Sequence, residues 1–165
     1  MKKILLLILV LCLMAVGQVV QAAPAPQLVQ TVDVVADKNV TPIDFSFFDQ
    51  PAPGKVEFSN VKNLWGAGAG MIFYLQTDNG DDWLMLSFGG GMVELRLQNK
   101  KVALFSEKVS AISARTPLTL TIQDGKLTAS IGSRTRTIPG VNAFSGNLTT
   151  QSIEGTLKAY QFPAE

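Results

Sequence analysis

The chain has 165 residues, with 14 lysines and arginines against 13 acidic residues, no histidine and one cysteine. This near balance, with Lys100-Lys101 as the one adjacent basic pair beyond the first three residues, argues against nucleic acid as a partner. Without histidine or a second cysteine, the chain cannot form a Ser-His or Cys-His nucleophile or a zinc site of histidines and thiolates.

The N-terminus has the pattern of a secretory signal peptide over residues 1–22. A basic start precedes the apolar run Ile4–Val16, and small residues follow, which predicts cleavage after Ala22 or Ala23. About 13 apolar residues are too few to span a bilayer as an anchor. We therefore expect a periplasmic or secreted protein that does not span the membrane after cleavage. It has no cysteine, because Cys12 is removed with the signal.

Residues 23–42 are predicted to hold an N-terminal leader and a first strand, and residues 43–165 the main domain. Short apolar stretches alternate with glycine, proline and aspartate turns, and no segment settles to a helical period. The Asp124-Gly125 pair is the strongest hairpin signal. This pattern predicts one all-β domain, a two-sheet antiparallel β-sandwich. The candidate strands are Leu28–Ala36, Ile43–Phe48, Lys55–Val61, Met71–Thr77, Trp83–Phe88, Met92–Gln98, Lys101–Phe105, Pro117–Gln123, Lys126–Ile131, Arg134–Ile138 and Ser152–Phe162.

The alternation of apolar and polar residues also predicts which side chains point into the sandwich. In Met92–Gln98, apolar residues alternate with Glu94 and Arg96, whose charges suit an ion pair on the wet face. The inward set is Val93, Leu95, Leu97, Leu118, Leu120, Ile122, Leu127, Ile131 and Leu157. The set expected to face solvent is Glu94, Arg96, Thr119, Thr121, Thr128 and Lys158.

Several of these stretches together resemble one family. Phe58-Ser59, Gly70–Leu75, Asp81–Leu86 and Gly91–Leu97 are similar to successive strands of the laminin G-like pattern, and Ser152–Tyr160 is similar to its closing strand. The resemblance implies the jelly-roll fold of concanavalin A-like lectins and glucanases, and the Lys-Lys, leucine-rich leader indicates an exported bacterial protein. The family's Trp-His pair and its C-terminal cysteine pair are missing, which sets the chain apart from the eukaryotic adhesion members.

The resemblance also implies a calcium site. The densest acidic cluster is Asp78, Asp81 and Asp82, and oxygen-rich loops suit calcium. In the resembled family an aspartate at the position of Asp82 holds the ion, and a backbone carbonyl that matches Asn99 assists it. A further ligand from a distant loop would fall at Asn142. The alternative is that the Asp-Asn-Gly-Asp-Asp run is simply a hairpin turn.

Two tryptophans are candidate ligand-binding residues, because an aromatic ring can stack on the apolar face of a sugar. Trp65 lies in a connection rich in glycine and alanine, and Trp83 points away from the core face of its strand. The alternative is that either ring packs in the core or at a sheet edge.

The carboxylates argue against an enzyme. Glycosidases of the concanavalin A-like fold place paired acids two residues apart on one strand, and no glutamate of the processed chain has such a partner. We expect a non-catalytic binding module that recognises a glycan or a protein surface, with or without calcium. The alternatives are a carbohydrate-active or degenerate enzyme of the cell envelope, or a structural envelope protein.

Overall fold

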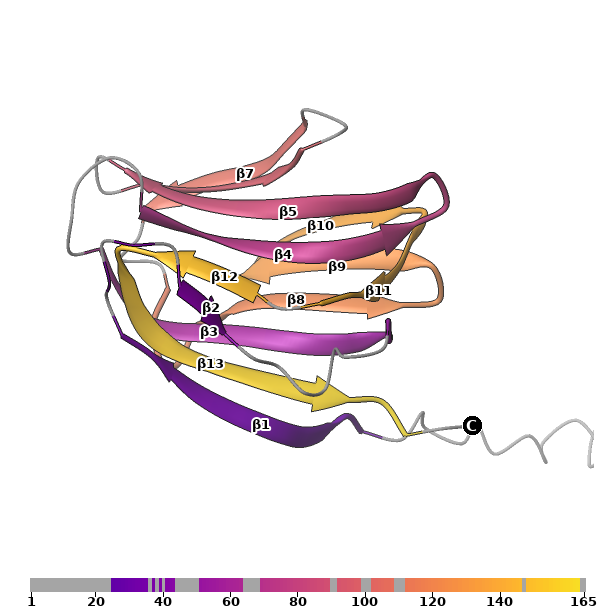
Figure 1. The fold of residues 1–165 in the computed structure, drawn as a ribbon, viewed down its shortest axis with the longest axis horizontal. Helices are drawn as coiled ribbons and strands as arrows, with labels where there is room; N and C mark the ends of the chain where they lie inside the picture. Colours follow the sequence, from indigo (N-terminus) through magenta and orange to yellow (C-terminus); the bar gives the residue numbers. More distant parts are fainter. Residues whose placement is uncertain are drawn as a thin grey trace, which may run out of the picture.

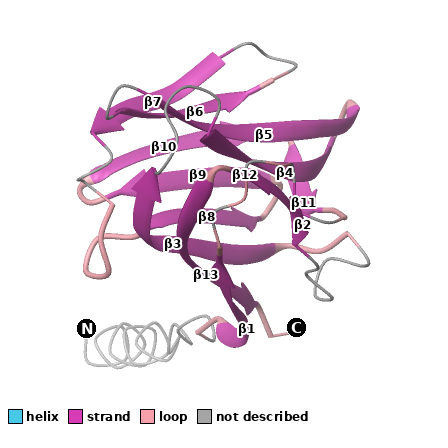
Figure 2. Cartoon of the chain, turned by 60° about the vertical axis from the view of Figure 1, so that its left-hand side comes forward, coloured by secondary structure: helices cyan, strands magenta, loops and turns pink. Residues whose placement is uncertain are grey.

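The computed structural model describes residues 25–35, 37, 39, 41–43, 51–63, 69–89, 92–98, 102–108, 112–146 and 148–163. Every regular element among them is a β-strand, as Figure 2 shows, and the strands form two antiparallel sheets. Among these residues, none belongs to a helix of the length and apolarity required to cross a bilayer. The predicted signal peptide, with Cys12, lies outside the described residues.

The first sheet has six strands in the order β1-β13-β3-β8-β9-β10. The N-terminal strand pairs with the C-terminal strand, and the two run side by side in Figure 1. The first strand is therefore an edge strand of this sheet. The six strands are β1 (Gln27–Val34), β3 (Gly54–Asn63), β8 (Leu118–Gln123), β9 (Lys126–Ile131), β10 (Arg134–Pro139) and β13 (Ile153–Gln161).

The second sheet has seven strands. Six follow the order β2-β12-β4-β5-β6-β7, and β11 pairs with β4 beside this path. The strands are β2 (Thr41–Ile43), β4 (Ala69–Thr77), β5 (Gly80–Gly89), β6 (Met92–Leu97), β7 (Val102–Lys108), β11 (Val141–Phe144) and β12 (Leu148–Gln151). The predicted all-β, two-sheet antiparallel sandwich is thus confirmed.

The core lies between the sheets and follows the period-two alternation of the strands. All nine residues predicted to point inward are buried, each with at most 4% of its surface exposed. All six residues predicted to face solvent remain partly exposed. The register read from the sequence is therefore correct, since a shift of one residue would have exchanged the two sets.

Two short strands were not predicted, β11 and β12. Both are four residues long, too short for their alternation to be recognised, and both are recruited by pairing with β4. The predicted strand at Ile43–Phe48 lies mostly outside the described residues, and only its first residue falls in β2. The predicted Asp124-Gly125 hairpin is confirmed, with φ of 52° and 66° at its two turn residues.

Candidate functional site

Two aromatic side chains lie next to each other on the outer face of the seven-stranded sheet. Tyr74 on β4 and Trp83 on β5 are directly paired across the two strands. Their neighbours in sequence, Phe73 and Leu84, point into the core and are buried, so alternation turns both aromatic rings outward. The exposed fractions are 38% for Tyr74 and 44% for Trp83, which is high for such large apolar side chains.

A hollow of about 270 Å³ lies on the same face, over β12, β4 and β5. Ile72 and Met85, which pair across β4 and β5, are one step along the outer face from the aromatic pair. The hollow is deepened by Gly70, where a Cβ atom would come within 2.9 Å of the Leu86 carbonyl oxygen. The lining residues are Ala69, Gly70, Met71, Ile72, Met85, Leu86, Ser87, Thr149, Thr150 and Gln151.

Polar groups of β6 border this apolar surface. Arg96 Nη2 donates to Glu94 Oε1 at 2.6 Å, so the ion pair expected from the sequence is present on the outer face. Both side chains are more than one third exposed, and the pair contributes little stability. The backbone N–H of Gln98 donates to the Trp83 carbonyl oxygen at 3.1 Å, which ties the end of β6 to β5 beside the tryptophan.

The sequence identified one member of this surface and missed the rest. Trp83 was predicted as a ligand-binding residue and lies on this surface beside the hollow, whereas Trp65 falls outside the described residues. Tyr74, Ile72 and Met85 were not predicted. Alternation along β4 and β5 turns them to the same side as Trp83, and the strand register then makes them its neighbours.

The three predicted metal ligands do not meet in the described part of the chain. Asp81 and Asp82 are consecutive in β5, so their side chains leave opposite faces of the sheet. Asp82 Oδ1 accepts the backbone N–H of Trp83 at 2.7 Å. Asn99 lies outside the described residues. Among the residues that are described, no group of three acidic, histidine or cysteine side chains is placed to hold a metal. The calcium site stays a prediction.

Asp78 and Asn142 do meet, although 64 residues separate them. Asn142 Nδ2 donates to Asp78 Oδ1 at 2.9 Å, and the Asp78 N–H donates to the Gly140 carbonyl oxygen at 3.1 Å. The Gly140 N–H in turn donates to the Gly125 carbonyl oxygen at 2.8 Å. These bonds connect the β4–β5 turn of one sheet to the β8–β9 turn of the other. Asp78 thereby has a structural role at the rim of the sandwich.

The outer face of the six-stranded sheet carries a different cluster, made of Lys55, Glu57 and Tyr160. Glu57 accepts from Lys55 Nζ and from the Tyr160 hydroxyl, each at 2.6 Å, and Lys55 Nζ lies 4.7 Å from the Tyr160 ring centroid. Burial opposes ionisation of Glu57, but these two hydrogen bonds and the Lys55 charge outweigh it, so its pKa is lowered. Burial, then the Glu57 hydrogen bond and charge, raise the pKa of Tyr160 to about 12.

Comparison with solved structures gives a β-glucanase of Bacillus licheniformis, with 10% sequence identity over 68% of each chain and a TM-score of 0.45. The architecture of the present chain rests on its own strand pairing, and the likeness says nothing about its activity. No protein-family model and no curated protein matches the chain.

Proposed function

We propose that this protein is a non-catalytic binding module that acts outside the cytoplasm and holds a glycan on the outer face of the seven-stranded sheet. The paired, exposed rings of Tyr74 and Trp83 carry the proposal. Exposing two such rings side by side forgoes the stabilisation that their burial would give, whereas a sugar ring can cover them from outside.

The hollow beside the aromatic pair supports a ligand longer than one sugar. Ile72 and Met85 lie two residues along the strands from Tyr74 and Trp83, which is about 7 Å. Thr149 and Gln151 lie at the β12 side of the hollow, and their polar groups are of the kind that bind hydroxyls. An apolar floor with a polar border is the composition typical of a small-molecule site.

The carboxylates on this face support binding rather than hydrolysis. Asp81 and Glu94 are the two acids on its described part, and the partner of Glu94 on β5 is Ser87, six residues from Asp81. Six residues of strand span about 20 Å. Paired catalytic carboxylates of glycosidases lie about 5–9.5 Å apart. Glu94 is also paired with Arg96.

A glycan array with the processed protein, followed by titration of the oligosaccharides it retains, tests the proposal. Trp83→Ala is expected to weaken binding on the order of tenfold, as loss of a central aromatic contact does. Thr121→Ala, on the outer face of the other sheet, is the matched control and should bind like the wild type. Retention of no glycan, or equal affinity of Trp83→Ala and wild type, would overturn the proposal.

A further inference from the structure

The two edges of the six-stranded sheet differ in how they are protected. At one end, β10 carries Arg134, Arg136 and Pro139, all exposed, which are the residue types that keep another strand from pairing. At the other end, β1 contains a single charged residue, Asp33. No described strand pairs with its outer side. The β1 edge therefore lacks the protection that β10 has.

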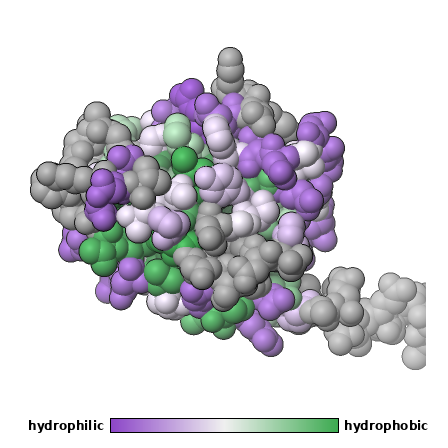
Figure 3. All heavy atoms as spheres, in the orientation of Figure 1, coloured by the Kyte–Doolittle hydropathy of each residue, from purple (hydrophilic) through white to green (hydrophobic). Residues whose placement is uncertain are grey.

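Apolar side chains are concentrated along this β1 edge. Leu28 and Val29 are 54% and 48% exposed, and Val35, directly after the strand, is 77% exposed. In Figure 3, hydrophobic atoms are visible along the lower margin of the molecule, where β1 runs in Figure 1. An edge strand that pairs with no described strand on its outer side and carries exposed apolar side chains is a template for an added strand.

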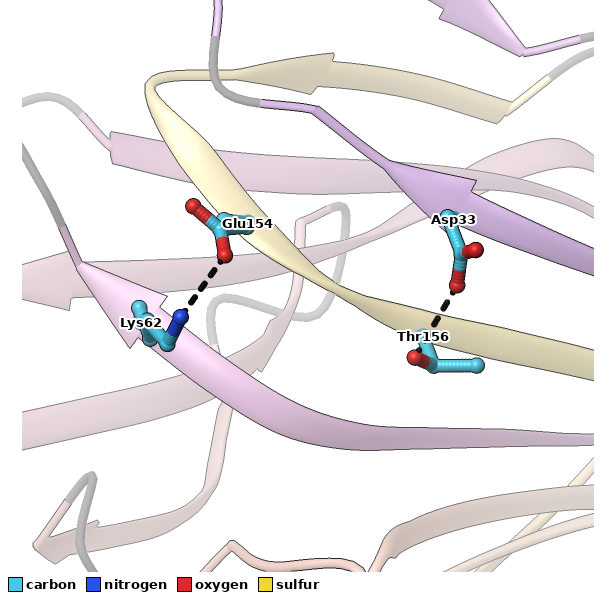
Figure 4. A network of polar contacts seen from close by, with 4 residues as sticks. All are labelled: Asp33, Lys62, Glu154 and Thr156. Carbon is cyan, nitrogen blue, oxygen red and sulfur yellow. Dashed lines mark hydrogen bonds and ion pairs between the residues drawn. The ribbon is translucent and has the colours of Figure 1, made fainter.

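A hollow of about 230 Å³ with several polar side chains in its lining lies at the C-terminal end of β1, over β13 and β3. Figure 4 shows four of its lining side chains, with dashed lines for two contacts. Lys62 Nζ pairs with Glu154 Oε1 at 2.9 Å, so this acid already has a cation. Asp33 accepts the Thr156 hydroxyl at 3.1 Å, and no described lysine or arginine forms an ion pair with it. Asp33 can therefore accept a cation from outside.

The geometry of an added strand brings such a cation to Asp33. The residue paired with Asp33 would lie directly opposite it, about 5 Å away between Cβ atoms, on the face that carries the hollow. The residues before and after this one in the added strand would point to the other face of the sheet, beside Val32 and Val34. Val34 belongs to the core, and Val32 packs against it. The edge thus fits an extended segment with apolar residues on one face and a basic residue on the other.

Two ways of pairing a second copy of this chain with this edge fit poorly. Residues 25–35 contain no lysine or arginine, so pairing β1 with β1 leaves Asp33 without a cation in any register. Pairing with β10 of another copy is also mismatched. Thr135 and Thr137 share the outer face with Thr128, so a continuous sheet places these threonines on the Asp33 side and the arginines beside the core.

We propose that β1 is a docking edge for a partner protein, whose extended segment pairs with β1 and places a lysine or arginine opposite Asp33. This interface is separate from the glycan surface, since it lies on the edge of the other sheet. It gives the protein a second, peptide-binding activity that does not depend on the proposed function.

Two labelled nine-residue peptides test this docking edge. The first has the sequence Thr-Val-Thr-Val-Lys-Val-Thr-Val-Thr, and the second has glutamate in place of the lysine. Fluorescence anisotropy with the processed protein should show the lysine peptide binding about two- to fivefold more tightly, the preference that one cross-strand charge pair provides. Hydrogen exchange of the β1 amides should slow when the lysine peptide binds.

Three variants make the test specific. Asp33→Asn should remove the preference for lysine, and Asp33→Lys should reverse it in favour of the glutamate peptide. Asp124→Asn is the matched control, because it removes the same charge at an exposed turn away from β1 and should change nothing. Equal binding of both peptides, binding of neither, or protection of amides outside β1 would overturn the proposal. Self-association that protects β1 would show that a second copy covers the edge.

Discussion

The two outer faces of the sandwich are built by the same alternation and yet differ in kind. On the seven-stranded sheet the outward positions of β4 and β5 hold Ile72, Tyr74, Trp83 and Met85. On the six-stranded sheet the corresponding positions of β8, β9 and β10 hold threonines and Ser130, and β3 and β13 add the Lys55, Glu57 and Tyr160 cluster.

The outward residues of the two faces suit different roles. Outward threonine is what a strand carries when the position needs only to suit an extended backbone and a wet surface. Outward tyrosine and tryptophan leave 38% and 44% of their surface exposed at Tyr74 and Trp83, which adds nothing to the solubility of the folded chain. Folding alone therefore explains the threonines of the six-stranded sheet, whereas the proposed ligand binding would explain the exposed aromatic pair of the seven-stranded sheet.

The two outer faces belong to sheets that pack on one shared core. Phe58→Ala tests this shared core and has the largest expected effect. Phe58 is 1% exposed in β3, so its loss should lower the free energy of unfolding by about 3–5 kcal/mol. Denaturant titration measures this loss. Thr121→Ala on the outer face should change stability by no more than about 0.5 kcal/mol. A small effect of Phe58→Ala on the free energy of unfolding would contradict the packing of Phe58 in the core between the sheets.

The polar cluster of the six-stranded face can be tested by pH. Because Tyr160 has its pKa raised from 10.0 to about 12, its neutral form is favoured by folding. The stability that it contributes should be complete below pH 10 and lost as the pH rises towards 12. Glu57 acts in the opposite direction, since its lowered pKa gives stability above pH 4.5 that is lost on acidification.

Tyr160→Phe should lower the free energy of unfolding at pH 7 by about 1 kcal/mol, because the hydrogen bond to Glu57 is partly exposed. Ultraviolet titration in a Tyr74→Phe background isolates Tyr160, since the chain has two tyrosines. A titration midpoint of Tyr160 near pH 10 would contradict the raised pKa and the contact with Glu57. Tyr160→Phe alone should leave glycan binding on the seven-stranded face unchanged.

Calcium is expected to have the smallest effect. Asp81 and Asp82 leave opposite faces of β5, so the two carboxylates cannot bind one ion together. If Asp82 holds calcium as the family resemblance implies, the melting temperature in millimolar calcium should exceed that in EDTA, as measured by thermal shift, and Asp82→Asn should remove the rise. Equal melting temperatures with and without calcium would contradict the metal site.

Strands can be predicted from the sequence where their alternating pattern is long enough to repeat. The six residues of Leu118–Gln123 show three inward apolar positions, and the structure buries all three. The four residues of Val141–Phe144 show no such repeat, and their strand exists because β4 offers a partner. Pairing between segments that are distant in the sequence depends on the tertiary structure, so local strand propensity cannot predict it.

The candidate site was found from the sequence only in part, for the same reason. Trp83 was identified from its position on one strand. Its neighbours Tyr74, Ile72 and Met85 depend on the register of two strands, and the hollow depends on Gly70 meeting the Leu86 backbone. The contact of Asp78 with Asn142 joins turns of two different sheets, so neither segment alone predicts it.

The pairing of the chain ends has a consequence for how the protein is made. β13 lies between β1 and β3, so both of these early strands meet their partner in the last strand of the chain. Leu28 pairs with Tyr160, and the loop that this contact closes is nearly as long as the domain. Residues 27–161 must nearly all be synthesised before the six-stranded sheet can close, and contacts of such separation form slowly. Until β13 emerges, β1 and β3 lack the strand that lies between them.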